Sequence, residues 1–124
     1  MINHSLVVAV QQQLIQDRGL NTDSSDVGKL QASLMRVENR IQYGIIRTHI
    51  EIAAWYAAAI ARGRCFPDAN KRTAYIVLIT YLARHGYDFP VSEADHLEDK
   101  IVELASGKLD PDSFALWLAE VLSQ

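Results

Sequence analysis

The sequence predicts a single all-α domain over residues 1–124, a helical bundle of about six helices with little or no sheet. Three observations lead to this fold class. Apolar residues recur at helical spacing through nearly the whole chain. Glycines follow most of the apolar segments, as expected of residues that end helices. A chain of 124 residues suffices for one hydrophobic core, and no internal repeat or low-complexity tract divides it.

Three helices are expected in the first half of the chain. They cover about residues 5–17, Asp26 to Ile41 and Thr48 to Ala61, and they end at Gly19, Gly44 and Gly63. Ser25 or Asp26 suits the N-cap of the second helix, because a short polar side chain there bonds a free N–H. The third helix is rich in alanine, which lets neighbouring helices approach closely.

Three more helices are expected in the second half. The segment Ala69–His85 is apolar nearly all round, so it is expected to be the central, buried helix, with Gly86 at its C′ position. Tyr87 to Pro90 is short and extended, in the manner of a β-arm. Ser92 is expected to cap a helix reaching about Ala105. Asp110 and Pro111 then form a strong start signal for a last helix ending at Leu122.

Composition excludes several classes of protein. Apolar residues make up 49% of the chain and charged residues 22%, which is ordinary for a globular domain. No apolar run reaches the length of a membrane span, and the first residues carry no basic segment typical of a secretory signal. Cys65 is the single cysteine, so no internal disulfide can form. We therefore expect a cytoplasmic protein without a membrane partner.

Charge is distributed unevenly. Residues 1–87 hold ten Lys/Arg and six Asp/Glu, whereas residues 88–124 hold two Lys and nine Asp/Glu. The net charge of -3 argues against direct nucleic-acid binding. The basic body suggests a face for an anionic ligand, although the charge asymmetry taken by itself is better explained by a solvated acidic helix pair at the C-terminus.

The stretch from Arg64 to Arg72 is the unusual part of the sequence, because it joins two apolar helices and is rich in charge. Asp68 stands where an N-cap would stand, and Ala69 and Asn70 open the next helix. The free N–H groups of a first helical turn attract anions, and Lys71 and Arg72 add two cations there. Cations at a helix N-terminus oppose its dipole, so their presence suggests a bound phosphate. The alternative is that Asp68 only caps the helix and both cations face solvent.

The motif Phe66-x-Asp68-Ala69-Asn70-Lys71-Arg72 resembles the signature of the Fic/Doc family, and above all its Doc, or death-on-curing, toxin branch. The segments around Leu30–Arg36, Ala58–Gly63 and Leu78–Tyr87 resemble the family's flanking helices, so the resemblance covers most of residues 5–105. It implies a Fic-fold helical domain.

The resemblance also implies a role for each motif residue. Asp68 would hold Mg²⁺ on the nucleotide phosphates, while Ala69, Asn70, Lys71 and Arg72 would cradle those phosphates. Lys71 matches the Doc pattern, where AMP-transferring relatives usually have glycine. This pattern implies ATP-dependent transfer of the γ-phosphate to a protein hydroxyl, with translation elongation factor Tu as the target. An AMP-transferring enzyme is the alternative within the family.

Arg64 departs from the family pattern, because it occupies the position of the motif histidine, the general base. Arginine is always protonated near neutral pH and cannot accept a proton, so catalysis by this chain should be weak or absent. Two interpretations stay open: an inactivated copy of a toxic enzyme, or a natural non-catalytic protein that binds nucleotide or a partner. In the former case, the active enzyme would be a toxin that stops translation and arrests growth.

Residues outside the motif also bear on function. No Ser or Thr is followed by Glu four residues later, so the inhibitory helix pattern of larger relatives is missing and a separate antitoxin is the expected partner. Basic side chains upstream of the motif are candidates for extending the nucleotide or target surface: Arg36, Arg40, Arg47 and Arg62. The histidines have no evident metal partner and are expected to be structural or exposed: His4, His49, His85 and His96. Trp55 and Trp117 are expected in the core or at a partner contact.

Overall fold

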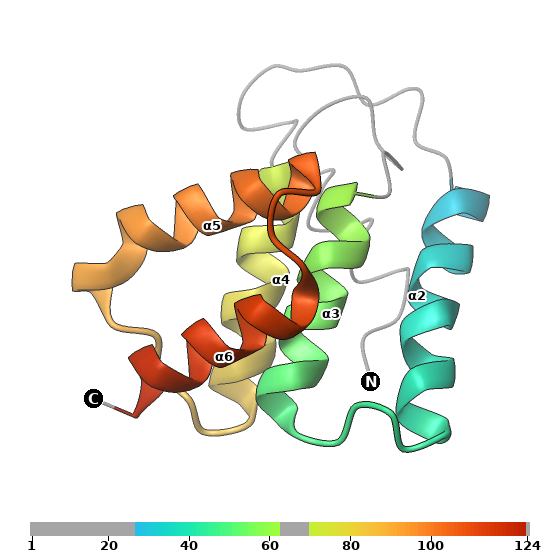
Figure 1. The fold of residues 1–124 in the computed structure, drawn as a ribbon, viewed down its shortest axis with the longest axis horizontal. Coiled ribbons are helices and arrows are strands. Elements are labelled where there is room, and N and C mark those ends of the chain that lie inside the picture. The colour runs from blue at the N-terminus through green and yellow to red at the C-terminus, as the bar shows by residue number, and fades with distance from the viewer. Residues whose placement is uncertain (1–26, 63–69, 124) are drawn as a thin grey trace.

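The computed structural model describes residues 27–62 and 70–123, and all its regular structure is helical (Figure 1). The helices are α2 (Val27–Gln42), α3 (His49–Arg62), α4 (Asn70–Arg84), the 3₁₀ turn η1 (Val91–Glu93), α5 (Ala94–Ser106) and α6 (Pro111–Leu122). The all-α prediction is therefore confirmed. Residues 87–90 form no regular structure, Pro90 has an extended backbone, and no strand is formed within the two described ranges. The helix predicted over residues 5–17 lies outside them.

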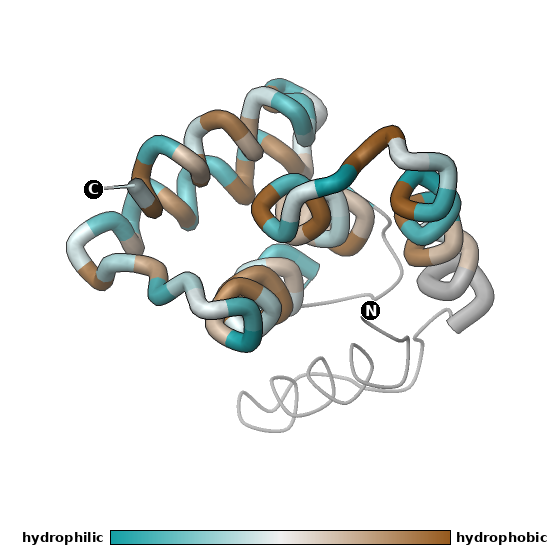
Figure 2. The backbone as a smooth tube through the Cα atoms, turned by 90° about the horizontal axis from the view of Figure 1, so that it is seen from below, coloured by the Kyte–Doolittle hydropathy of each residue, from teal (hydrophilic) through white to brown (hydrophobic). Residues whose placement is uncertain are grey.

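The centre of the bundle is α3, which packs against α2, α4, α5 and α6. Its alanines explain this position, because small side chains let several helices approach one axis. Ala53, Ala54 and Ala57 have no exposed surface. The prediction that the helix ending at His85 is the central one is wrong: α4 packs mainly on α3 and α5, and its Ile76 and Ile79 are only half-buried. Figure 2 shows the apolar residues gathered where the helices face one another.

Local capping chemistry sets most of the helix ends. Asp110 caps α6, where its Oδ2 accepts a hydrogen bond from the Ser113 backbone N–H at 3.0 Å, with Pro111 as the first helical residue. Gly86 follows α4 with a φ of 87°, and the Tyr87 N–H donates back to the Leu82 carbonyl at 2.9 Å. These two predicted helix boundaries are confirmed, and the second is a Schellman motif.

One predicted helix start is confirmed to within one residue, and another is wrong. The third predicted helix begins at His49, and Thr48 is its cap: Thr48 Oγ1 accepts from the Glu51 N–H at 3.1 Å, while the Glu51 carboxylate accepts from the Thr48 N–H. This reciprocal pair is a capping box. The predicted cap at Ser92 is wrong, because the chain after Pro90 first forms the 3₁₀ turn, and α5 starts at Ala94 without a side-chain cap.

Candidate functional site

The first turn of α4 carries the described part of the predicted phosphate site. Asn70 is half-buried at the start of the helix, and Lys71 and Arg72 are exposed. The turn holds no acidic residue, and neither cation forms an ion pair with any described residue. Two cations thus lie at the positive end of the helix dipole, an arrangement that an anion would stabilise.

A cavity of about 160 Å³ lies beside this turn, between α4 and α5. Lys71, Arg72 and Tyr75 line it from α4; Glu98, Ile101 and Val102 line it from α5. It therefore combines two cations with a half-buried tyrosine and an aliphatic wall. Such a cavity suits one part of a phosphorylated ligand, since whole small-molecule sites are usually larger. Sequence reasoning found the two cations but missed the α5 wall, which comes from a different segment of the chain.

The remaining predicted site residues lie outside the described ranges. They are Arg64, Asp68 and Ala69, together with Cys65 and Phe66. Their roles stay predictions. Within residues 27–62 and 70–123, no group of three or more His, Cys, Asp or Glu side chains could hold a metal ion. Lys71 and Arg72 could bind phosphate oxygens, and Glu98 is the carboxylate among the side chains that line the cavity.

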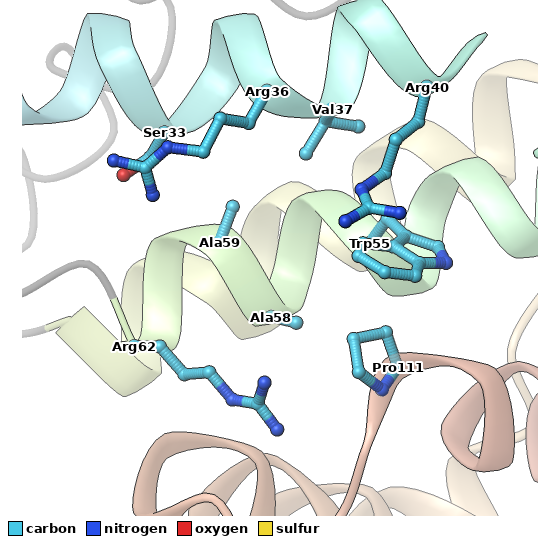
Figure 3. Close-up of a pocket in the computed structure, with 9 residues that line it drawn as sticks. All are labelled: Ser33, Arg36, Val37, Arg40, Trp55, Ala58, Ala59, Arg62 and Pro111. Carbon is cyan, nitrogen blue, oxygen red and sulfur yellow. The ribbon is translucent and has the colours of Figure 1, made fainter. Parts of the chain in front are cut away.

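Three of the four upstream arginines gather in a second cavity, of about 280 Å³, between α2, α3 and the start of α6 (Figure 3). We call it the arginine groove; its lining residues are Ser33, Arg36, Val37, Arg40, Trp55, Ala58, Ala59, Arg62 and Pro111. Arg47 does not join them, because its Nε donates to the Gly44 carbonyl at 2.8 Å. The groove shares no lining residue with the α4–α5 cavity.

Two histidines that look unrelated in the sequence lie together in the structure. The rings of His49 and His85 stack with centroids 3.8 Å apart, and His49 Nδ1 lies 3.1 Å from the Tyr81 hydroxyl. Stacking removes water from His85 and places it beside another titratable ring, so desolvation and the His49 charge lower its pKa. His96 behaves oppositely, because its hydrogen bond to the Glu93 carboxylate raises its pKa.

These opposite pKa shifts predict opposite effects on stability below about pH 6.5. Because the unfolded chain binds a proton at His85 more readily than the folded one, the free energy of unfolding should fall there as the solution is acidified. His85→Gln should therefore reduce the loss on going from about pH 7.5 to pH 5. His96→Gln should increase that loss, because it removes a histidine that binds a proton more readily in the folded chain than in the unfolded one. Urea titrations of the unchanged protein and of both variants at the two pH values test this prediction. Equal pH dependence of the free energy of unfolding in all three proteins would contradict it.

The arrangement described so far is that of an all-α protein with two exposed cations, Lys71 and Arg72, in the first turn of a helix beside a cavity. Comparison with known proteins shows the family of the chain. The Fic/DOC family model matches residues 1–82, so the chain belongs to the Fic/Doc family. It is 38% identical over 91 residues to the protein kinase Doc of Escherichia phage P1, an alignment covering 73% of this chain and 71% of that protein. The resemblance drawn from the motif is confirmed. No helix in the described ranges is long and apolar enough to cross a membrane.

Proposed function

We propose that the chain is a Doc-like toxin whose reaction is transfer of the γ-phosphate of ATP to a hydroxyl group of translation elongation factor Tu, and that Arg64, in place of the catalytic histidine, leaves this copy weak or inactive. A separate antitoxin would restrain it in the cytoplasm. The observation that carries the proposal is the pair of cations, Lys71 and Arg72, at the N-terminus of α4 beside a cavity. The 38% identity to a protein named as a kinase supports phosphoryl transfer.

In this proposal the chain mainly binds and orients the nucleotide. Asn70, Lys71 and Arg72 would hold the phosphates from the first turn of α4, and Asp68 would hold Mg²⁺. Bound there, Mg²⁺ would supply positive charge that offsets the charge of the phosphates. Tyr75 and the α5 wall contact a less polar part of the ligand. Cations placed beside the phosphates stabilise the charge that develops during transfer, which is how such sites lower a barrier.

Arg64 supports a second candidate, a Fic-fold protein that binds nucleotide or a partner without turnover. In the family-derived mechanism the residue at this position takes the proton from the incoming hydroxyl, and a guanidinium cannot do so. Both candidates share the nucleotide site, so binding tests the site and phosphoryl transfer separates the candidates.

We expect Arg72→Ala to weaken ATP binding about 10- to 100-fold, because a charge-assisted hydrogen bond contributes roughly 1.5–3 kcal/mol. Isothermal titration calorimetry with Mg²⁺-ATP measures the effect. Arg84→Ala is the matched control, since Arg84 is exposed in the last turn of the same helix.

Asp68→Ala should remove the dependence of ATP affinity on Mg²⁺, seen when the metal is chelated. Unchanged affinity in both variants would refute the phosphate site.

A further inference from the structure

The cavity between α4 and α5 carries opposite charges that do not pair. Lys71 and Arg72 line its α4 wall, and Glu98 lines its α5 wall. All three side chains are exposed, and the Glu98 carboxylate forms neither an ion pair nor a hydrogen bond with any described residue. A ligand that is anionic at one end and carries hydrogen-bond donors at the other would satisfy both walls at once.

The surface between these charges is apolar. Tyr75 lies one helical turn after Lys71, so the two side chains share a face of α4, about 6 Å apart along its axis. On α5, Ile101 and Val102 follow Glu98 at helical spacing and share its face. The cavity of about 160 Å³ is smaller than the pockets of whole small molecules, which are about 300–1,000 Å³. It therefore has room for one ring of a ligand beside the charged groups.

The Glu98 carboxylate limits what that ring can be. An ionised carboxylate only accepts hydrogen bonds, so the ligand has to present donors to it. The two neighbouring hydroxyl groups of a ribose are such donors, and carboxylates bind ribose hydroxyls in other nucleotide-binding folds. The negative charge also repels phosphate, which directs the phosphates of a nucleotide towards Lys71 and Arg72 and its sugar towards Glu98. An amino group of a base is the other donor that a nucleotide offers, and ribose-modified nucleotides distinguish the two.

We propose that Glu98 and Tyr75 hold the ribose of the nucleotide: the Glu98 carboxylate accepts hydrogen bonds from the 2′- and 3′-hydroxyl groups, and the half-buried Tyr75 ring packs on the sugar. The inference rests on the proposed nucleotide-binding function and makes Glu98 its specificity-determining residue. The phosphates are identical in ATP and 2′-deoxy-ATP, so Lys71 and Arg72 cannot distinguish these nucleotides. Preference for a ribonucleotide therefore has to come from the α5 wall.

Isothermal titration calorimetry of the full chain with ATP and with 2′-deoxy-ATP, both with Mg²⁺, tests the inference. We expect ATP to bind about tenfold more tightly, because a hydrogen bond to an exposed carboxylate lies at the lower end of what charge-assisted bonds contribute. In Glu98→Ala the ratio of the two affinities should fall to about one, since the site no longer bonds the hydroxyl that distinguishes them. Glu98 is exposed, so this change should leave the fold intact, and circular dichroism checks it.

Two matched variants show whether the Glu98 carboxylate itself bonds the sugar. Asp99→Ala removes the neighbouring exposed carboxylate of α5, which does not line the cavity, and should keep the affinity ratio of the unchanged chain. Tyr75→Phe keeps the ring and removes its hydroxyl, and should also keep the ratio. Loss of the ratio in Tyr75→Phe but not in Glu98→Ala would assign the hydroxyl contact to Tyr75 and overturn the role of Glu98.

Inorganic tripolyphosphate separates this inference from the proposed function, because it carries phosphates without a sugar. Arg72→Ala should weaken its binding, and Glu98→Ala should not. If tripolyphosphate binds in this way but ATP and 2′-deoxy-ATP bind the unchanged chain equally, the ribose assignment is wrong while the phosphate site stands. Loss of discrimination between ATP and GTP in Glu98→Ala, with the ribose ratio retained, would place the base at Glu98 and would also overturn it. If neither tripolyphosphate nor ATP binds, the nucleotide site and the ribose assignment fail together.

Discussion

Arg64→His should raise the rate of phosphoryl transfer by about 10²- to 10⁴-fold, the usual contribution of a positioned general base. An imidazole titrates near pH 6.5 and can accept the proton of an incoming hydroxyl, whereas the guanidinium of Arg64 stays protonated. The measurement is transfer of label from ATP carrying ³²P at the γ-position to purified elongation factor Tu. The expected rate should fall as the pH drops below the pKa of the new histidine.

The controls for Arg64→His distinguish a base from a mere loss of positive charge. Arg64→Gln removes the charge without supplying a base, so its rate should stay near that of the unchanged chain. Label transferred from the α-phosphate and not from the γ-phosphate would identify an AMP-transferring enzyme. Retained ATP binding without any transfer in Arg64→His would favour the non-catalytic candidate. Absence of ATP binding in the unchanged chain as well would mean that the first turn of α4 is not a nucleotide site.

Features encoded within a few residues of one another were predictable from the sequence. The Asp110–Pro111 start of α6 depends on a side chain reaching an N–H three residues on, and the helix ends at Gly86 and Gly107 depend on a left-handed residue directly after the last turn. The pair of cations in the first turn of α4 is of the same kind, since Lys71 and Arg72 are adjacent in the sequence. The prediction that Ser92 caps a helix is wrong because the chain after Pro90 forms a 3₁₀ turn in place of a capped helix start.

Features that depend on packing between distant segments were not predictable. Nothing in the sequence indicates that three of the four arginines upstream of the motif line one groove. Arg47 instead donates a hydrogen bond to a carbonyl of its own turn. That grouping follows from how α2 lies along α3. The stacking of His49 on His85 likewise requires the start of α3 to meet the end of α4. Periodicity identified which helices are apolar, but the small side chains of α3 decide which one is central.

Phe114→Ala should cost about 3–5 kcal/mol of unfolding free energy, the range for deleting a buried phenyl ring. Phe114 has no exposed surface and stacks on Trp117 of the same helix with ring centroids 6.1 Å apart. It lies on α6, which packs on α3, and it belongs to the buried core cluster, so the substitution leaves a cavity inside the core. Domains are stable by about 5–15 kcal/mol, so this one change removes a large share of the total. Leu116→Ala is the control, because Leu116 is 74% exposed on the same helix and should change stability by no more than about 0.5 kcal/mol. Urea denaturation of the two variants compares them directly, and similar costs would mean that α6 does not pack on α3 through Phe114.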